Sequence, residues 1–219
     1  TTTDTYTIII NRAPSSIASL SNLDLSSGSL TPVFASATLS YVAGVSNATT
    51  SITVTPTVTD LTATVTVNGV SVASGTASAN IPLVIGSNMV TVVVTAQDGI
   101  TKTTYIVVVT RTASSTATLS NLTISSGTLA PNFNTSVTSY AVSVPNATSS
   151  VTVTPTATDP TTSTITVNGT AVASGSASGS IPLQVGSNII NVVVTAQDGT
   201  AVTYTITVSR TPATSVVLA

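Results

Sequence analysis

The stretch IPLVIGSNMVTVVVTAQDG, from Ile81 to Gly99, decides the fold because it occurs again as IPLQVGSNIINVVVTAQDG, from Ile181 to Gly199. The two copies are identical at 14 of 19 positions. Each copy is rich in β-branched residues and ends in Asp-Gly, a pattern typical of a strand that runs into a tight turn. Self-similarity over a long fixed distance indicates a repeat architecture. The sequence therefore predicts two copies of one β-rich unit.

The repeat extends from this stretch to both ends of the chain. TYTIIINR, from Thr5 to Arg12, matches TYIVVVTR, from Thr104 to Arg111, and TYTITVSR, from Thr203 to Arg210. We predict four segments: 1–12 as the last strand of a preceding repeat, 13–111 as repeat 1, 112–210 as repeat 2, and 211–219 as the first strand of a following repeat. On this pattern we expect the chain to be a window from a longer array of like domains arranged end to end.

Alternating apolar and polar residues predict the strands. Tyr204, Ile206 and Val208 alternate with Thr and Ser, so the three share one face of the last strand. Asn68-Gly69 stands between two valines and predicts a two-residue hairpin, because both turn positions must accept a positive φ. Pro56 predicts an edge strand or a bulge. Such signals at short spacing predict an all-β sandwich of seven or so strands per repeat.

A second apolar face is predicted on the last two strands of the repeat. Ile106 and Val108 stand off the inward alternation of the last strand, as does Ile9 in the first segment. Val93 and Val193 do the same on the strand before it. One interpretation is that a loop covers this face. The other is that the face contacts a neighbouring chain in a bundle or filament.

The composition excludes most catalytic chemistry. The 219 residues include no His and no Cys, and only 5% are charged. The usual Ser-His and thiolate nucleophiles and the usual zinc sites are therefore missing. Four Lys and Arg are too few for a phosphate-binding surface, and no apolar run approaches the roughly 20 residues of a membrane-spanning helix. We predict a non-catalytic chain with no catalytic, cofactor-binding or metal-binding residues, no nucleic-acid partner and no membrane span in this segment.

The order of motifs LxLxxGxLxPxF, a Tyr, a V-N-G hairpin, IPLxxGxNxxxVxVxAxDG and YxxxVxR resembles the bacterial cadherin-like β-sandwich repeat. The matching residues of repeat 1 are Leu23, Leu25, Gly28, Leu30, Pro32, Phe34, Tyr41, Asn68, Gly69, Leu83, Gly86, Asn88, Asp98, Gly99, Tyr105 and Arg111. Those of repeat 2 are Leu122, Ile124, Gly127, Leu129, Pro131, Phe133, Tyr140, Asn168, Gly169, Leu183, Gly186, Asn188, Asp198, Gly199, Tyr204 and Arg210.

The resemblance covers nearly the whole chain. It implies tandem immunoglobulin-like or cadherin-like β-sandwich domains, of the kind found in arrays on bacterial surface and secreted proteins. It implies neither a catalytic activity nor one agreed ligand. The calcium sites of animal cadherins need several acidic residues at each domain junction, and this sequence has none there, so we expect no bound calcium.

Four of the six acidic residues lie in or near predicted turns. Asp98 and Asp198 stand in tight turns, and Asp60 and Asp159 precede turn-like segments. We predict that these carboxylates accept hydrogen bonds from nearby backbone groups, as Asp commonly does in turns. The alternative, a calcium site, needs clustered carboxylates among about six or seven oxygen ligands.

The three arginines, Arg12, Arg111 and Arg210, occupy one repeated position at the end of the last strand. We predict a structural role, in which the guanidinium bonds a turn carbonyl or an Asp at the domain junction. Contact with a ligand is the alternative.

Covalent modification has weaker support. Lys102 is the only lysine, and a crosslink from it to Asn or Asp needs a helper acid, while a Thr–Gln ester through Gln97 or Gln197 needs acid/base helpers that are missing. Five N-x-S/T sequons occur, a number that chance alone predicts in so Ser- and Thr-rich a chain. They begin at Asn47, Asn121, Asn134, Asn146 and Asn168.

Three functional hypotheses remain open. The first is a structural repeat segment of a bacterial extracellular filament or cell-surface stalk or adhesin, with neighbouring repeats of the same protein as partners. The second is a subunit that lends a terminal strand, such as 5–12, to its neighbour. The third is an adhesin module that binds surface glycans or a host protein. All three place the chain outside the cell or on its surface.

Overall fold

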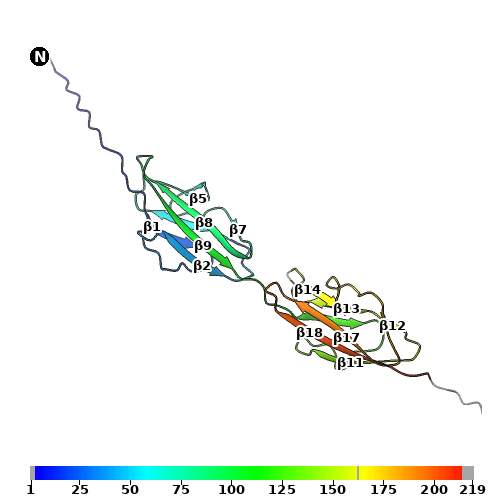
Figure 1. The fold of residues 1–219 in the computed structure, drawn as a ribbon. Helices are drawn as coiled ribbons and strands as arrows, with labels where there is room; N and C mark the ends of the chain where they lie inside the picture. Colours follow the sequence, from blue (N-terminus) through cyan, green and yellow to red (C-terminus); the bar gives the residue numbers. More distant parts are fainter. Residues whose placement is uncertain (1–2, 162, 214–219) are drawn as a thin grey trace, which may run out of the picture. The chain divides into compact units, whose positions relative to one another are not determined.

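The computed structural model describes residues 3–161 and 163–213, which form two compact units that divide between Ala113 and Ser114 (Figure 1). All the regular structure of the described residues is β-strand. None of these residues forms a helix, so no helix in the described ranges could cross a membrane. The chain enters each unit at one end of its sandwich and leaves at the other end (Figure 1).

Each unit contains nine strands in its described residues, and two of these strands in unit 1 and three in unit 2 are only two residues long. In unit 1 they are β1 (Leu20–Leu25), β2 (Ser40–Val45), β3 (Ser51–Ile52), β4 (Val54–Val58), β5 (Thr64–Val67), β6 (Val70–Val72), β7 (Ile81–Pro82), β8 (Gly86–Thr95) and β9 (Lys102–Arg111). In unit 2 they are β10 (Leu119–Ile124), β11 (Ser139–Val144), β12 (Ser150–Val151), β13 (Val153–Ala157), β14 (Thr164–Val167), β15 (Thr170–Ala171), β16 (Ile181–Pro182), β17 (Gly186–Thr195) and β18 (Ala201–Arg210).

One layer of unit 1 is a five-stranded sheet in the order β2-β9-β8-β5-β6. β8 and β9 pair antiparallel along their full length, and β2 pairs with β9 in parallel. The opposite layer consists of the pairs β1-β4 and β3-β7, which the continuous segment 51–58 joins. Unit 2 repeats this topology with β11-β18-β17-β14-β15 facing β10-β13 and β12-β16. The prediction of an all-β chain with two tandem sandwiches is confirmed.

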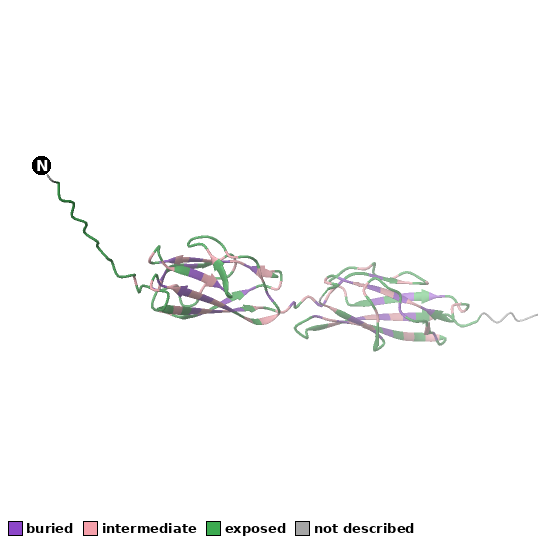
Figure 2. Ribbon diagram, turned by 90° about the horizontal axis from the view of Figure 1, so that it is seen from above, coloured by how far each residue is buried: buried purple, intermediate pink, exposed green. Residues whose placement is uncertain are grey.

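The core of each unit lies between its two layers (Figure 2), and valine is its commonest residue. On β9, Tyr105, Val107 and Val109 are fully buried, while the residues between them face outward. The same alternation buries Tyr204, Ile206 and Val208 on β18, as the sequence predicts. Burying a large apolar side chain contributes roughly 1.5–3 kcal/mol, so the alternating strands supply most of the cohesion.

Pro56 lies in the middle of β4, and its carbonyl group faces a loop and not β1. Gly75 N–H donates to the carbonyl of Pro56 at 2.8 Å. On either side of the proline, the N–H groups of Val54 and Val58 donate to the hydroxyls of Ser78 and Ser74. On this side of β4 the serine hydroxyls take the place of the carbonyls of a neighbouring strand, and the proline itself has no N–H to donate. This arrangement confirms the prediction of an edge strand. Unit 2 has the same arrangement around Pro155.

The predicted turns are also observed. Asn68 and Gly69 have φ values of 48° and 82° and connect β5 to β6, as the two-residue hairpin requires. Asp98 and Gly99 lie in the turn between β8 and β9, the two longest strands of the unit.

The flanking segments form no strand where the structure describes them. Residues 5–12 are exposed and outside any strand, as are 211–213. Residues 1–2 and 214–219 lie outside the described residues. The assignment of 1–12 and 211–219 to neighbouring repeats therefore stays a prediction.

Candidate functional site

The arginine at the end of each last strand bonds backbone carbonyls. Arg111 donates through Nε and Nη2 to Asn47 O, at 2.9 and 2.6 Å, and through Nη1 to Leu83 O at 3.1 Å. Arg210 repeats all three bonds in unit 2, to Asn146 O and Leu183 O. The guanidinium thus ties the end of the last strand to two loops of its own unit. Arg12 differs, since its guanidinium donates through Nη2 to Gln97 Oε1 at 3.3 Å.

A buried tyrosine ties the first strand of each unit to the last one. The backbone N–H of Leu20, at the start of β1, donates to the Tyr105 hydroxyl at 3.0 Å, and this hydroxyl donates to Ser36 O at 2.9 Å. In unit 2, Leu119 N–H donates to Tyr204 at the same 3.0 Å. Both leucines are fully buried, so this N–H has no access to water as an alternative partner.

The turn aspartates act locally, as the sequence predicts. The Asp98 carboxylate accepts from Ile100 N, Thr101 N and the Thr101 hydroxyl, at 2.9, 2.9 and 2.6 Å. The Thr101 hydroxyl, followed by the backbone N–H groups, lowers the pKa of Asp98 below 3.8. The pKa of Asp60 is lowered too, most of all by a hydrogen bond from the Ser15 hydroxyl and next by the bonds from Thr62. These contacts make each carboxylate part of a turn and not part of a cation site.

These pKa shifts define the pH dependence of stability. A carboxyl whose pKa is depressed in the folded state stabilises the fold above its unfolded pKa, and that contribution disappears as the pH falls through the folded value. Because the chain has no His, we expect the melting temperature to be flat from about pH 5 to 8 and to fall below about pH 4. Calorimetry across this range checks the prediction. The double variant D60N/D98N should lose less stability on acidification than the parent.

The sequence-predicted crosslink residues do not form a reactive group in the described residues. Lys102 is exposed at the first position of β9, opposite Thr95. Gln97 Oε1 accepts from Ser15 N at 3.0 Å, and Gln197 Oε1 accepts from Ser114 N at 3.2 Å. Both glutamines therefore hold the segment that leads into their own unit.

The asparagines of the sequons make structural hydrogen bonds. The side chains of Asn47 and Asn146 donate to Thr112 O and Thr211 O, at 3.3 and 3.0 Å. Asn168 Oδ1 accepts from Asn191 N, and Asn134 Oδ1 accepts from Ser136 N. Asn121 Oδ1 accepts from Leu122 N, and this N–H group points to the free edge of β10.

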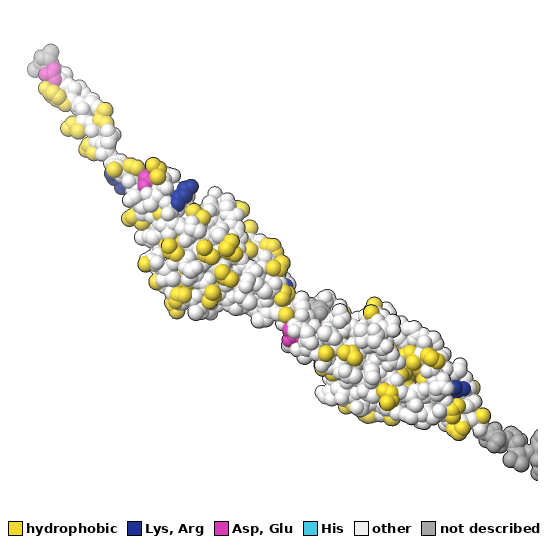
Figure 3. Space-filling model, viewed as in Figure 1, with side chains coloured by type: hydrophobic (Ala, Val, Ile, Leu, Met, Phe, Trp, Pro, Cys, Tyr) yellow, Lys and Arg dark blue, Asp and Glu magenta, His cyan; other side chains and the backbone are white. Residues whose placement is uncertain are grey.

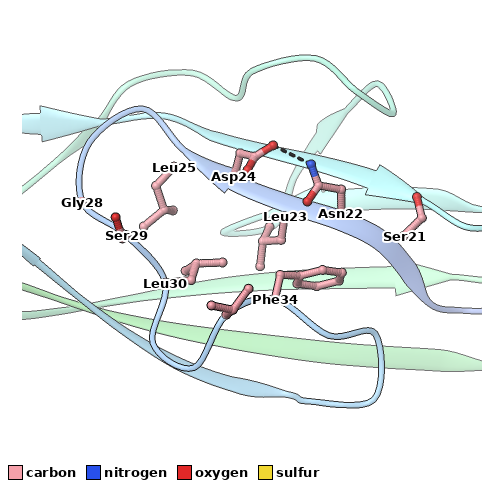
Figure 4. A pocket seen from close by; sticks show the side chains of 10 residues that line it. Ser21, Asn22, Leu23, Asp24, Leu25, Gly28, Ser29, Leu30 and Phe34 are labelled. Carbon is pink, nitrogen blue, oxygen red and sulfur yellow. Dashed lines mark hydrogen bonds between the residues drawn. The ribbon is translucent and has the colours of Figure 1, made fainter.

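A groove of about 490 Å³ runs beside β1, between this strand and the segment 28–34 (Figure 4). Leu23, Leu30 and Phe34 lie between the strand and this segment, while Asn22 donates to Asp24 at 2.6 Å on the rim (Figure 4). Leu23 is opposite Pro56, whose carbonyl accepts a hydrogen bond from Gly75 N. The peptide groups of Leu23 therefore point away from β4 and into the groove. Such an unpaired strand edge can bond an extended peptide.

The corresponding groove of unit 2 is smaller, at about 280 Å³. Here Asn121 caps the edge by accepting from Leu122 N at 2.9 Å, whereas Asn22 of unit 1 is turned toward Asp24. Thr123 replaces Asp24, and Asn132 replaces the exposed Val33. The two copies of this edge therefore differ in the groups that they present.

The aromatic side chains of both units are used inside the sandwich. Tyr41, Tyr105, Tyr140 and Tyr204 are buried, and Phe34 stacks on Tyr41 with ring centroids 5.9 Å apart. Among the described residues, the exposed aromatic ring is Tyr6, which is 86% exposed in the segment before the first sandwich. Among the described residues, no group of three or more His, Cys, Asp or Glu is placed to hold a metal ion.

Asn88 belongs to the repeat motif, but the sequence analysis assigned it no role, and the structure shows that this role is structural. Its side chain accepts from Val84 N and donates to Val84 O, both at 2.8 Å, and it also donates to Gly86 O and Val109 O. Asn188 makes the same set of bonds in unit 2. The available signal was the triplet Gly-Ser-Asn, which both repeats keep unchanged at the start of a long strand.

This geometry agrees with the comparison with known families. A family model described as the cadherin-like beta sandwich domain matches residues 20–112 and 119–211. The chain belongs to this family and contains two of its domains in tandem. Domains of this kind are typically non-catalytic.

A curated relative and two solved structures are also similar. A protein of Evansella cellulosilytica named "Putative membrane protein" is 43% identical over 84 residues, which are 38% of this chain and 13% of the relative. Mouse cadherin-23 EC22-24 is 12% identical, with a TM-score of 0.33 over 84% of this chain and 66% of that one. The fibronectin(III)-like modules of Clostridium thermocellum CbhA are 14% identical, with a TM-score of 0.25 over 87% and 94%. These TM-scores are too low to support a statement about function.

Proposed function

We propose that this chain is a non-catalytic structural segment of a bacterial extracellular filament or cell-surface stalk. The observation that carries the proposal is the bond from Leu20 N and Leu119 N to Tyr105 and Tyr204, at 3.0 Å in both units. The same side-chain tie therefore joins the start of the first strand, where the backbone receives tension, to the last strand of each sandwich.

The strand geometry supports resistance to pulling. Tension along a unit loads the ladder between β1 and β4 lengthwise, so its hydrogen bonds share the load and do not open one after another. At the opposite end, Arg111 fixes the last residue of β9 to two loops. Unit 2 has the corresponding ladder and the corresponding arginine. Each unit is thus secured at the two points where the chain enters and leaves.

The connection between the units is short. Thr112 N donates to Val45 O of unit 1 at 3.1 Å, and Ser114 N donates to Gln197 of unit 2 at 3.2 Å. Only Ala113 lies between these two anchored residues. Tension therefore passes through the backbone of one residue and not through a long flexible tether.

The surface chemistry supports an exposed location. Cadherin-like domains are usually extracellular, and the Evansella relative is named as a membrane protein. The chain has no Cys and no His, so its stability is insensitive to redox conditions and to pH near neutrality. Four Lys and Arg in the whole chain leave few sites for trypsin-like proteases.

Labelling of intact cells tests the proposal. Antibodies raised against the chain should decorate extended structures outside unpermeabilised cells of the source bacterium in electron microscopy. Labelling that requires permeabilisation would overturn the proposed location.

A second experiment separates a continuous chain from subunits that exchange strands. Boiling the native material in detergent should leave one polypeptide much larger than 21.6 kDa if the repeats are covalently continuous. A band near 22 kDa would favour the strand-exchange hypothesis instead.

A further inference from the structure

The outer face of the five-stranded sheet in unit 1 carries a group of apolar side chains among Ser and Thr residues. Val42 and Met89 are 54% and 66% exposed, and Ile106, Val108 and Val93 are partly exposed beside them. None of the five belongs to the core cluster or to the partly buried residues packed against it. The exposure of Val42 and Met89, on either side of Val108, argues against a loop that covers this face.

We call this set of side chains the β8/β9 patch: Val42, Met89, Val93, Ile106 and Val108. Thr91 separates Met89 from Val93 on β8, and Val93 is opposite Thr104. Val108 of β9 lies directly between Val42 of β2 and Met89 of β8 in the strand register. Ile106 is two residues along the same strand and so faces the same side. Hydrophobic side chains gather over β2, β8 and β9 in the space-filling view (Figure 3).

Unit 2 has the same sheet with a more polar outer face. Thr207 replaces Val108 between Ala141 and Ile189, and Thr205 replaces Ile106. The contrast extends over the surface of the units, because nine large hydrophobic residues of residues 13–112 are exposed, against two of residues 113–213. The nine are Ile17, Val33, Leu39, Val42, Leu61, Val70, Val84, Met89 and Ile100. The fold therefore tolerates a polar outer face, and the apolar residues of unit 1 are not needed to form the sheet.

We propose that the β8/β9 patch is a lateral contact surface whose partner is the same patch on a second copy of this chain. This inference rests on the proposed function, since copies in a filament or stalk lie side by side at high local concentration. Contacts of this kind would join neighbouring chains without adding a separate adhesive domain.

Charge and shape favour a second copy over a charged partner. The patch carries no charge, so a charged partner would lose hydration without gaining an ion pair there. Sheet faces of this type pack on each other about 10 Å apart, as they do inside a β-sandwich. Lys102 lies on the same face at the far end of β9. A two-fold arrangement places the two lysines at opposite ends of the contact and avoids repulsion between them.

The size of the patch predicts a weak contact. The patch lies on β2, β9 and β8, which are about 4.8 Å apart, and extends over about five residues, so it covers roughly 250 Å². A stable interface buries about 800 Å² on each partner. One pair of patches should therefore associate only at high concentration, and several such contacts along an array would strengthen each other through avidity.

Exchange of residues between the repeats tests the inference. Sedimentation equilibrium of the chain from about 10 µM to about 1 mM should show weak, reversible dimerisation. The variant I106T/V108T, which carries the residues of unit 2, should dimerise at least tenfold more weakly. The reciprocal variant T205I/T207V should dimerise more strongly than the parent. All four substitutions use residues that the same fold already holds at these positions, and circular dichroism verifies folding.

Two results would overturn the inference: a parent chain that stays monomeric throughout this range, or an I106T/V108T variant that associates as strongly as the parent. Neither result would affect the labelling of intact cells, so failure of the lateral contact is distinguishable from failure of the proposed location.

Discussion

Replacing Gly127 with Ala should lower the free energy of unfolding of unit 2 by about 2–4 kcal/mol. Gly127 has a φ of +78°, a conformation that costs an L-residue energy regardless of its surroundings. An added Cβ would also lie 2.5 Å from Val142 Cγ1 and 2.9 Å from Ser143 O. The loop after β10 would have to move away from β11. Chemical denaturation followed by circular dichroism measures the loss.

Gly169→Ala provides a matched control in the same unit. Gly169 has a φ of +82°, but an added Cβ would meet nothing within 4 Å. This variant should lose only about 1 kcal/mol from backbone strain. Equal losses in the two variants would show that the close approach of the loop to β11 is unimportant.

Arg111→Met should destabilise unit 1 by about 2–4 kcal/mol, because it removes three charge-assisted hydrogen bonds and leaves two carbonyls short of partners. Arg111→Lys should recover only part of this loss, since an ammonium cannot reproduce the planar fork of the guanidinium. Differential scanning calorimetry should show that one transition moves down while the transition of unit 2 stays in place.

Arg12→Met is the control for Arg111. Arg12 stands at the same position of the repeat, but its 3.3 Å bond to Gln97 is exposed. Its replacement should change stability by less than about 0.5 kcal/mol. A large effect of Arg12→Met, or none of Arg111→Met, would contradict the role that we assign to the carbonyl contacts.

Local rules explain which parts of the fold could be predicted. The hairpin at Asn68-Gly69 follows from the backbone angles that its two residues tolerate, and the buried face of β18 follows from simple alternation. Turn aspartates such as Asp98 bond their own neighbours, so spacing alone identifies them. The arginine contacts were predictable as a class because Arg111 and Arg210 recur at the end of the same strand.

Long-range pairing explains what could not be predicted. β2 pairs in parallel with β9, although Ser40 and Ile106 are 66 positions apart. Nothing in either segment indicates which strand it pairs with. The hydroxyls of Ser74 and Ser78 cover β4 from a loop that reads only as Ser- and Ala-rich sequence. The exposure of Val108 also depends on what lies above the sheet, which periodicity cannot show.

The most direct test of the central claim, that each repeat is a separate load-bearing unit, is single-molecule force spectroscopy of the chain held at its two ends. Two unfolding events should occur, and each should lengthen the chain by the same amount. This amount is the extended length of one repeat, about 350 Å, minus the length of the folded unit. Tyr105→Phe should lower the force of one event and leave the other unchanged. A single rupture of the whole chain, or smooth extension at low force, would contradict the claim.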